Sequence, residues 1–552
     1  MEVTMMYRAK DFIAALLLLI VMLGVSGCVS AGTEEESTLS IASPVSTDGS
    51  ASVTEPVSVE SKSIEIMDDE SFNALSEDEK VYVANKLYAT LYKGKDLTTV
   101  KEEIGTGTFI TDFYKTLYDS NVEQPDLDKI LPDDYRISDG NRFGDPLLEK
   151  FRSIYSNIIS TLYHTRLSKE YYDEWMAYIL GQTILFSPAW EVESVYPFPE
   201  LISSNYSRLK TMIAQNSHVK DIAYTHMVSK ENWSRFRSPE DNGREMLEIW
   251  LYDFNDLHVP LAAQALKNWR WVVSYGPVSE TANDYYYTFY NDETNPDEKN
   301  SEPIDFLGTT VTTGEDFYRA VVEHEDFMRG VVQRLVNIFF VTFPEDRRRE
   351  IVEDIVETDP KTFRDIFDKI IFSKEYLLES DKVKSYEEIY MSLAHKLDIN
   401  PGADFFDRMH QPGSQVYEGG LAVSKQLAFT YKLGRSDMVP SDSDSIMRLH
   451  LNIRDAVFLN RRGAKGWNYS ELLTRYDTTT PENYLNSMFL DVVGRKMSED
   501  EKETLINIAE NAGCISDTGF DKFTMMLMTF DYFSRLSEIY VYTKVQAQGD
   551  ES

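Results

Sequence analysis

The chain has 552 residues, of which 42% are hydrophobic, enough for one large core or for two or three packed lobes. It carries 55 Lys and Arg residues against 92 Asp and Glu residues, a formal net charge of -37. A surface this acidic repels phosphate backbones, which argues against nucleic acid as a partner.

The N-terminus has the pattern of a bacterial lipoprotein signal. Arg8 and Lys10 form a short basic region, and the apolar run 12–25 that follows is too short for an ordinary membrane span. The run leads into VSGC, a lipobox-like ending at Cys28. We predict a signal peptide over 1–27 and acylation of Cys28, palmitate included, which would bind the protein to a membrane through its N-terminal lipid. The alternative is an ordinary secretory signal with an incidental cysteine.

The residues after Cys28 indicate an envelope location and a flexible tether. Position 29 is valine rather than aspartate, which by resemblance to Gram-negative lipoproteins favours the outer membrane. Residues 28–65 are rich in Ser, Thr, Glu, Pro and Val and cannot order themselves by burying apolar area. Cys514 is the only other cysteine, so lipidation of Cys28 would exclude an intrachain disulfide.

Beyond residue 65 the pattern is that of a mainly α, multi-helical, bundle-like fold. Ser76 and Glu79 form a capping box, and the apolar residues behind it repeat every four positions. Further helices are predicted at 146–164, 168–186, 203–228, 314–341, 345–357, 361–373, 385–397, 419–433, 444–460, 482–493, 498–512 and 518–545. The best strand candidate is YYYTFY, Tyr285–Tyr290, in a minor β-hairpin.

We divide the helical part into three regions: an N-terminal region at 66–145, a central domain at 146–480 and a C-terminal module at 481–546. The stretches 332–377 and 484–533 share an order of helix, acidic cap, helix, loop and helix. We interpret them as copies of a duplicated helical module, although capping chemistry that recurs by need would give the same pattern.

The stretch PEDNGREMLEIWLYDFNDLHVPLAAQALKNWRW, residues 239–271, contains two blocks that resemble a family signature. The first block matches through Glu240, Gly243, Arg244, Glu245, Met246, Leu247, Glu248 and Ile249, and the second through Ala262, Ala263, Gln264, Ala265, Leu266 and Trp269.

These blocks resemble the bacterial domain-of-unknown-function 1800 (DUF1800) family, and the weaker resemblance around them covers about 150–475. It implies an exported protein and supplies no established reaction. A His-Asp pair of the family corresponds to Asn291-Asp292 here, which puts in doubt any chemistry that needs that histidine.

Three charges stand inside the first block, and two interpretations are open. On a helix, Arg244 and Glu248 share a face, as do Glu245 and Glu248, and the surrounding apolar residues predict a buried helix. The charges then form either an internal ion-pair network or a carboxylate pair for acid–base or metal chemistry, with Arg244 as an anion clamp. We expect Trp269 to be a core residue rather than a sugar platform.

Other motifs are incomplete. His324-Glu325 lacks the second zincin histidine, because position 328 is Met, and no P-loop, Rossmann or Gly-x-Ser-x-Gly pattern occurs. The basic cluster at 461–467 would bind an anionic group or pair with a carboxylate.

We predict no cofactor and no resident metal. The first functional hypothesis is a non-catalytic binding, assembly or scaffold role in the envelope, with a protein or polymer partner. The second is an envelope hydrolase, possibly metal-dependent, that uses Glu245 and Glu248 with Arg244.

Overall fold

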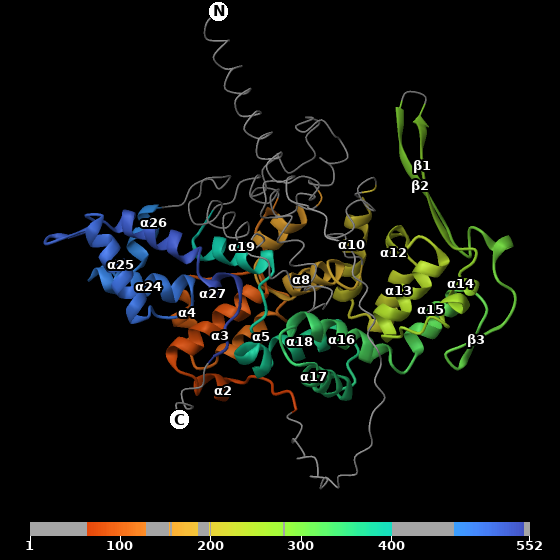
Figure 1. The fold of residues 1–552 in the computed structure, drawn as a ribbon, viewed down its shortest axis with the longest axis horizontal. Coiled ribbons are helices and arrows are strands. Elements are labelled where there is room, and N and C mark those ends of the chain that lie inside the picture. Colours follow the sequence, from red (N-terminus) through yellow and green to blue (C-terminus); the bar gives the residue numbers. More distant parts are fainter. Residues whose placement is uncertain are drawn as a thin grey trace, which may run out of the picture. The chain divides into compact units, whose positions relative to one another are not determined.

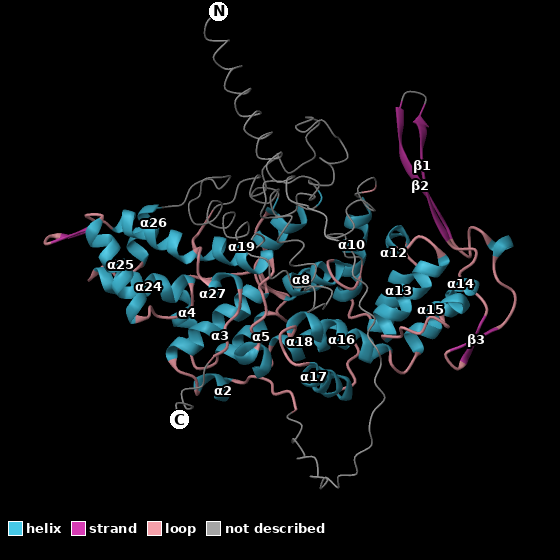
Figure 2. Cartoon of the chain, in the orientation of Figure 1, coloured by secondary structure: helices cyan, strands magenta, loops and turns pink. Residues whose placement is uncertain are grey.

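The computed structural model describes residues 63–127, 157–185, 200–279, 282–399 and 469–545, together with Ile154 and Phe198. Cys28, the predicted signal peptide, nearly all of the predicted tether, the basic cluster at 461–467 and the predicted helices at 419–433 and 444–460 lie outside these residues. The described part is mainly helical, with three two-stranded antiparallel sheets (Figure 2). The predicted fold class is confirmed.

The first four described helices include the one that begins at the predicted capping box. They are α2 (Asp69–Asn73), α3 (Glu77–Thr90), α4 (Leu97–Ile104) and α5 (Phe109–Thr116). The Ser76 side chain accepts from the Glu79 backbone, and the Glu79 side chain accepts from the Ser76 backbone, so the predicted start of α3 is confirmed. Tyr92 adopts a left-handed conformation with φ of 55° just after α3, as is common where a helix ends.

Six helices follow in the next part of the chain. They are α8 (Lys169–Gly181), α10 (Glu200–Ala214), α11 (Val219–Met227), α12 (Lys230–Arg235), α13 (Pro239–Leu251) and α14 (Val259–Ala265). The prediction of a single helix at 203–228 is wrong, because the non-helical residues 215–218 separate α10 from α11. Asn216 is left-handed with φ of 53°, and the His218 ring caps the new helix by accepting from Lys220 N.

A long β-hairpin follows α14. Strand β1 (Arg270–Ser279) pairs antiparallel with β2 (Ala282–Tyr290), and the ribbon extends beyond the neighbouring helices (Figure 1). At its base Trp271 stacks on Tyr287 at 4.2 Å between ring centroids. The predicted strand Tyr285–Tyr290 is confirmed within β2, whereas β1 was not predicted.

Two short strands and seven helical segments continue the chain to residue 396. After the turn η2 (Pro296–Glu298), β3 (Ile304–Phe306) and β4 (Thr309–Val311) form a hairpin. They precede α15 (Gly314–Glu323), α16 (Phe327–Phe339), α17 (Glu345–Glu357), α18 (Phe363–Ile371), the π-helical turn η3 (Glu375–Glu379) and α19 (Tyr386–Lys396). The helix predicted at 314–341 is two helices, because His324 takes an extended backbone with ψ of 145°.

The C-terminal part contains four helices and a small hairpin. The helices are α23 (Tyr469–Arg475), α24 (Pro481–Val492), α25 (Glu499–Asn511) and α26 (Lys522–Phe533), followed by the single turn α27 (Ser537–Tyr540). Strands β5 (Ile515–Ser516) and β6 (Gly519–Phe520) lie between α25 and α26. The helix predicted at 518–545 is therefore too long at both ends. The duplicated module stays a prediction.

One hydrophobic core runs through the described helices, from Met67 near the start to Tyr540 near the end. Helix α19 contacts both α3 and α24, so N-terminal, central and C-terminal elements meet around it. Within the residues that the structure describes, no helix combines the length and the apolar character needed to cross a membrane.

Candidate functional site

The three signature charges lie on α13, and the predicted buried helix is wrong. Arg244 is exposed, while Glu245 and Glu248 are half-buried. The helix buries one face only, through Asn242, Gly243, Met246, Leu247, Trp250 and Leu251. The charges of α13 therefore face or approach solvent instead of being sealed in the core.

The buried polar residue of α13 is Asn242, which sequence reasoning missed. Its side chain is fully enclosed and donates to Phe236 O at 3.2 Å. The same amide accepts from the Tyr318 hydroxyl at 2.8 Å, and that hydroxyl in turn accepts from Trp233 Nε1 at 2.9 Å. The signal was present, because Asn242 lies four and eight residues before Met246 and Trp250, on the same helical stripe.

Close backbone contacts fix the neighbours of α13. A Cβ atom on Gly330 of α16 would lie 1.9 Å from Trp250 O, so only glycine permits this crossing. Trp269 is 1% exposed and stacks on Trp233 with 5.7 Å between centroids. The expectation of a core role for Trp269 agrees with this position.

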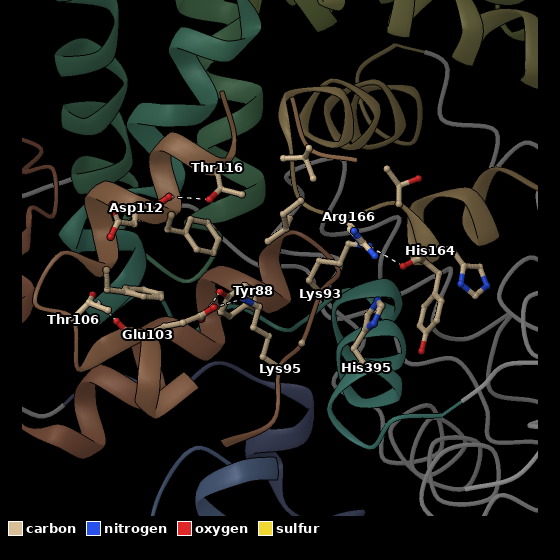
Figure 3. Close-up of a pocket in the computed structure, with 17 residues that line it drawn as sticks. Tyr88, Lys93, Lys95, Glu103, Thr106, Asp112, Thr116, His164, Arg166 and His395 are labelled. Atoms are coloured by element: carbon tan, nitrogen blue, oxygen red, sulfur yellow. Dashed lines mark hydrogen bonds and ion pairs between the residues drawn. The ribbon is translucent and has the colours of Figure 1, made fainter. Parts of the chain in front are cut away.

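A sizeable cavity lies elsewhere, between α3, α4, α5, the segment 163–167 and α19. Its volume is about 530 Å³, within the range of about 300–1,000 Å³ that small-molecule sites occupy. Figure 3 shows two sides of different character, with Tyr88, Glu103 and Thr116 on one and Lys93, His164 and His395 on the other. We call it the Lys93 pocket.

One side of the Lys93 pocket is aromatic. The Tyr88 ring lies 5.1 Å from Phe113 and 6.5 Å from Phe109 between centroids, and all three side chains are buried. The Tyr88 hydroxyl donates to Glu103 Oε2 at 2.6 Å, and Lys95 pairs with the other oxygen of that carboxylate. Burial, and next the charge of Glu103, raise the pKa of Tyr88, so this hydroxyl stays protonated.

The other side contains a buried amine, Lys93. Its Nζ donates to Leu162 O at 2.6 Å and to Tyr163 O at 2.8 Å, at the end of the helical residues 157–164. A cation is favoured there because the last carbonyls of a helix carry partial negative charge. Burial lowers the pKa of Lys93 well below its usual value, opposed by Glu174.

Two imidazoles lie beside this amine. The His395 ring stacks on Tyr163 at 4.0 Å with 9° between planes, and its Nε2 is buried without a hydrogen-bond partner in the described structure. Burial, followed by repulsion from Lys93 and His164, lowers the pKa of His395 well below its usual value. Burial and Lys93 lower the pKa of His164 to about 4. Both rings are therefore neutral near pH 7.

A polar clamp holds the outer edge of the pocket. Arg166 N donates to Gln124 Oε1 at 2.8 Å, and Gln124 Nε2 donates to Ser168 Oγ at 2.9 Å. The Arg166 guanidinium donates to Glu123 O at 3.1 Å. This clamp ties the segment after α5 to the start of α8.

The pocket combines apolar walls with a few donors, which suits binding of a small molecule that has an aromatic body and one acidic group. An acid placed beside Lys93 would accept a hydrogen bond from an amine that pairs with no carboxylate among the described residues. Glu245 and Glu248 do not line this pocket. In the described ranges, no group of three or more His, Cys, Asp or Glu side chains is arranged to hold a metal ion.

The sequence offered little to find this pocket. Its lining comes from residues 88–122, 163–167 and 395, which only the folded chain brings together. The available hint was a lysine placed just after the C-terminal end of α3. Comparison of the chain with family models, curated proteins and solved structures found no match.

Proposed function

We propose that the chain is a lipid-anchored binding protein of the cell envelope, whose ligand is a small aromatic acid held in the Lys93 pocket. The anchor rests on the lipobox that ends at Cys28, and the outer membrane of a Gram-negative bacterium is the favoured location. The DUF1800 resemblance, which implies an exported protein, agrees with this proposal.

The observation that carries the proposal is the buried amine of Lys93 in a cavity with aromatic walls. An ammonium group has three N–H donors, and two of those on Lys93 bind the carbonyls of Leu162 and Tyr163. His395 Nε2 on the same side has no hydrogen-bond partner within the part of the chain that the structure describes. A ligand acid group would bind the third N–H of Lys93 and would add its negative charge to that of Glu174 in stabilising the protonated amine.

Fluorescence titration with anilinonaphthalene sulfonate, an aromatic probe with one acid group, tests the proposal on the purified chain. We expect saturable binding that weakens about tenfold or more in Lys93→Met, the equivalent of about 1.4 kcal/mol or more. Lys115→Met is the matched control, because Lys115 lies on α5 with its side chain 70% exposed and does not line the pocket. Equal affinity in Lys93→Met, Lys115→Met and the unmodified chain would overturn the proposal.

A second pair of variants tests the pocket without Lys93→Met, in case that variant does not fold. Thr116→Phe places a large ring inside the pocket, whereas Lys115→Phe places the same ring on the outer face of α5. We expect Thr116→Phe alone to lose probe binding while both variants keep the helical circular dichroism of the unmodified chain. Retained binding in Thr116→Phe would place the probe outside the pocket.

A second candidate function is attachment to an envelope polymer through the β1–β2 ribbon. Tyr275 and Tyr285 face each other across the ribbon with 4.9 Å between centroids and are 64% and 46% exposed. Paired, exposed aromatic faces suit stacking on the sugar rings of a glycan strand. Co-sedimentation with purified peptidoglycan sacculi tests this role. We expect Tyr275→Ser combined with Tyr285→Ser to abolish it and Phe254→Ser, an exposed aromatic elsewhere, to leave it unchanged.

The hydrolase hypothesis for Glu245, Glu248 and Arg244 stays a weaker proposal. Its support is that the half-buried carboxylates and the exposed arginine are reachable from solvent. A metal analysis of the purified chain tests the metal-dependent form. A stoichiometric transition metal that is lost in Glu245→Gln combined with Glu248→Gln would support it over the binding role.

A further inference from the structure

A second, smaller cavity lies between α3, the loop 380–385, α19 and the C-terminal segment 539–542. Its wall contains the three lysines Lys86, Lys384 and Lys396. Lys86 and Lys396 are 1% and 5% exposed, and Lys384 is partly exposed. Because three amines share one enclosed space, their charges must be balanced, relieved by loss of protons, or both.

Two of the nearby carboxylates, Glu388 and Glu538, are already engaged. Glu388, the one carboxylate in the cavity wall, receives two hydrogen bonds from Lys382 at 2.9 and 2.7 Å, and its Oε1 also accepts from Tyr542. Glu538 pairs with Arg495 at 2.8 Å. In the described part of the chain, no carboxylate lies within ion-pair distance of Lys86, Lys384 or Lys396.

The three amines have donors to spare. Each makes one hydrogen bond of 2.6 Å to a backbone carbonyl: Lys86 to Ser380, Lys384 to Glu538 and Lys396 to Asp491. The Tyr542 ring lies 4.8 Å from Lys86 Nζ and 4.9 Å from Lys384 Nζ, which adds a weaker cation–π attraction. An ammonium group carries three N–H donors, so each can bind a further acceptor inside the cavity.

The size of the cavity limits the acceptor. Its volume is about 40 Å³, whereas one water molecule needs roughly 10–15 Å³ of such space. A single small ion or a few waters fit, and an organic acid or a phosphate ester does not.

We propose that this cavity is a binding site for one small monovalent inorganic anion of the halide class, held by Lys86, Lys384 and Lys396. The site is independent of the Lys93 pocket and of the proposed function. Beside the cavity, two backbone hydrogen bonds connect the C-terminal segment to the loop before α19: Tyr542 N donates to Lys382 O at 3.0 Å, and Lys384 N donates to Tyr540 O at 2.8 Å. A bound anion would strengthen this connection.

Deprotonation of the lysines is the competing way to relieve the charge. Burial and the charge of Lys396 lower the pKa of Lys384 to about 7, and burial lowers the pKa of Lys396 to about 8, opposed by Asp491. Burial and repulsion from Lys382 lower the pKa of Lys86 well below its usual value. A bound anion would hold the protons on these amines, so the two alternatives differ in their response to salt.

Thermal unfolding of the full chain at pH 7 in sodium chloride and in sodium gluconate at equal ionic strength tests the proposal. We expect a saturable, chloride-specific rise in Tm, of about 2 °C when chloride reaches about ten times its Kd. Gluconate is too large for the cavity and should give no such rise. Identical Tm values in the two salts would overturn the proposal.

Two further measurements locate the effect. Lys384→Gln should remove the chloride-specific rise, whereas the control Lys361→Gln, at a lysine that is 57% exposed, should keep it. A rise that survives in Lys384→Gln would place the anion elsewhere and overturn the assignment. In crystals grown in bromide, we expect an anomalous peak beside Lys86 and Lys396, and a cavity without one would contradict the site.

Discussion

Replacing Asn242 with alanine tests the interpretation of the signature helix α13. The substitution removes the donor to Phe236 O and the acceptor of the Tyr318 hydroxyl. Each buried group left without a partner costs about 1–3 kcal/mol, and the space left by the amide adds to the loss. We expect the free energy of unfolding to fall by about 3–5 kcal/mol.

Urea unfolding followed by tryptophan fluorescence measures this loss, because Trp233, Trp250 and Trp269 are buried around the helix. Arg244→Ala on the same helix is the control and should change the free energy by less than about 0.5 kcal/mol, since Arg244 is exposed. The reasoning would be refuted if Asn242→Ala were neutral, or if Arg244→Ala were as damaging as Asn242→Ala.

Three further predictions follow from single contacts or single groups. Gly330→Ala should destabilise the chain by about 1–3 kcal/mol or more in thermal unfolding, because its Cβ would press on the Trp250 carbonyl; an unchanged Tm would contradict the crossing of α13 and α16. The pKa of His164 is lowered to about 4, so between pH 6.5 and 4 the unfolded chain binds a proton that the folded chain refuses, and stability falls as pH drops through this window. Urea unfolding at pH 7 and pH 4.5 measures this loss of stability, and we expect the loss to be about 2 kcal/mol smaller in His164→Gln than in the unmodified chain. An equal loss in the two proteins would contradict the burial of His164. Cys28→Ala should abolish palmitate labelling in cells, and continued labelling would refute the lipobox.

Local capping chemistry was predicted well from the sequence. Ser76 and Ser498 each begin a helix at the expected residue, because a capping box needs only the residue three positions later. Breaks inside helical runs were missed at Asn216 and His324. There the apolar spacing continues across the break, and only the folded backbone shows that two helices pack separately.

The hairpin was half predicted for a related reason. The β2 strand is rich in tyrosine, which favours strands, whereas β1 contains Gly276 and Pro277, which are depleted in strands. In the folded chain, Trp271 pairs with Phe289 and Val273 pairs with Tyr287. These cross-strand contacts stabilise β1, and they cannot be predicted from the β1 sequence alone.

The sites were harder to predict than the fold. The charges of α13 were assigned to the right helix and to the wrong environment, because Ile249 and its apolar neighbours suggest burial on all sides, while α14 and α16 cover one side only. Lys93, His164 and His395 meet only in the folded chain, and no local pattern links them.

The most direct test of the central claim is a crystal structure of the chain soaked with 4-bromobenzoate, an aromatic acid whose bromine is located by anomalous scattering. The account predicts a bromine peak beside the Phe109 and Phe113 rings and a carboxylate within hydrogen-bond distance of Lys93 Nζ. An empty Lys93 pocket at saturating ligand, or bromine peaks only elsewhere on the chain, would contradict it.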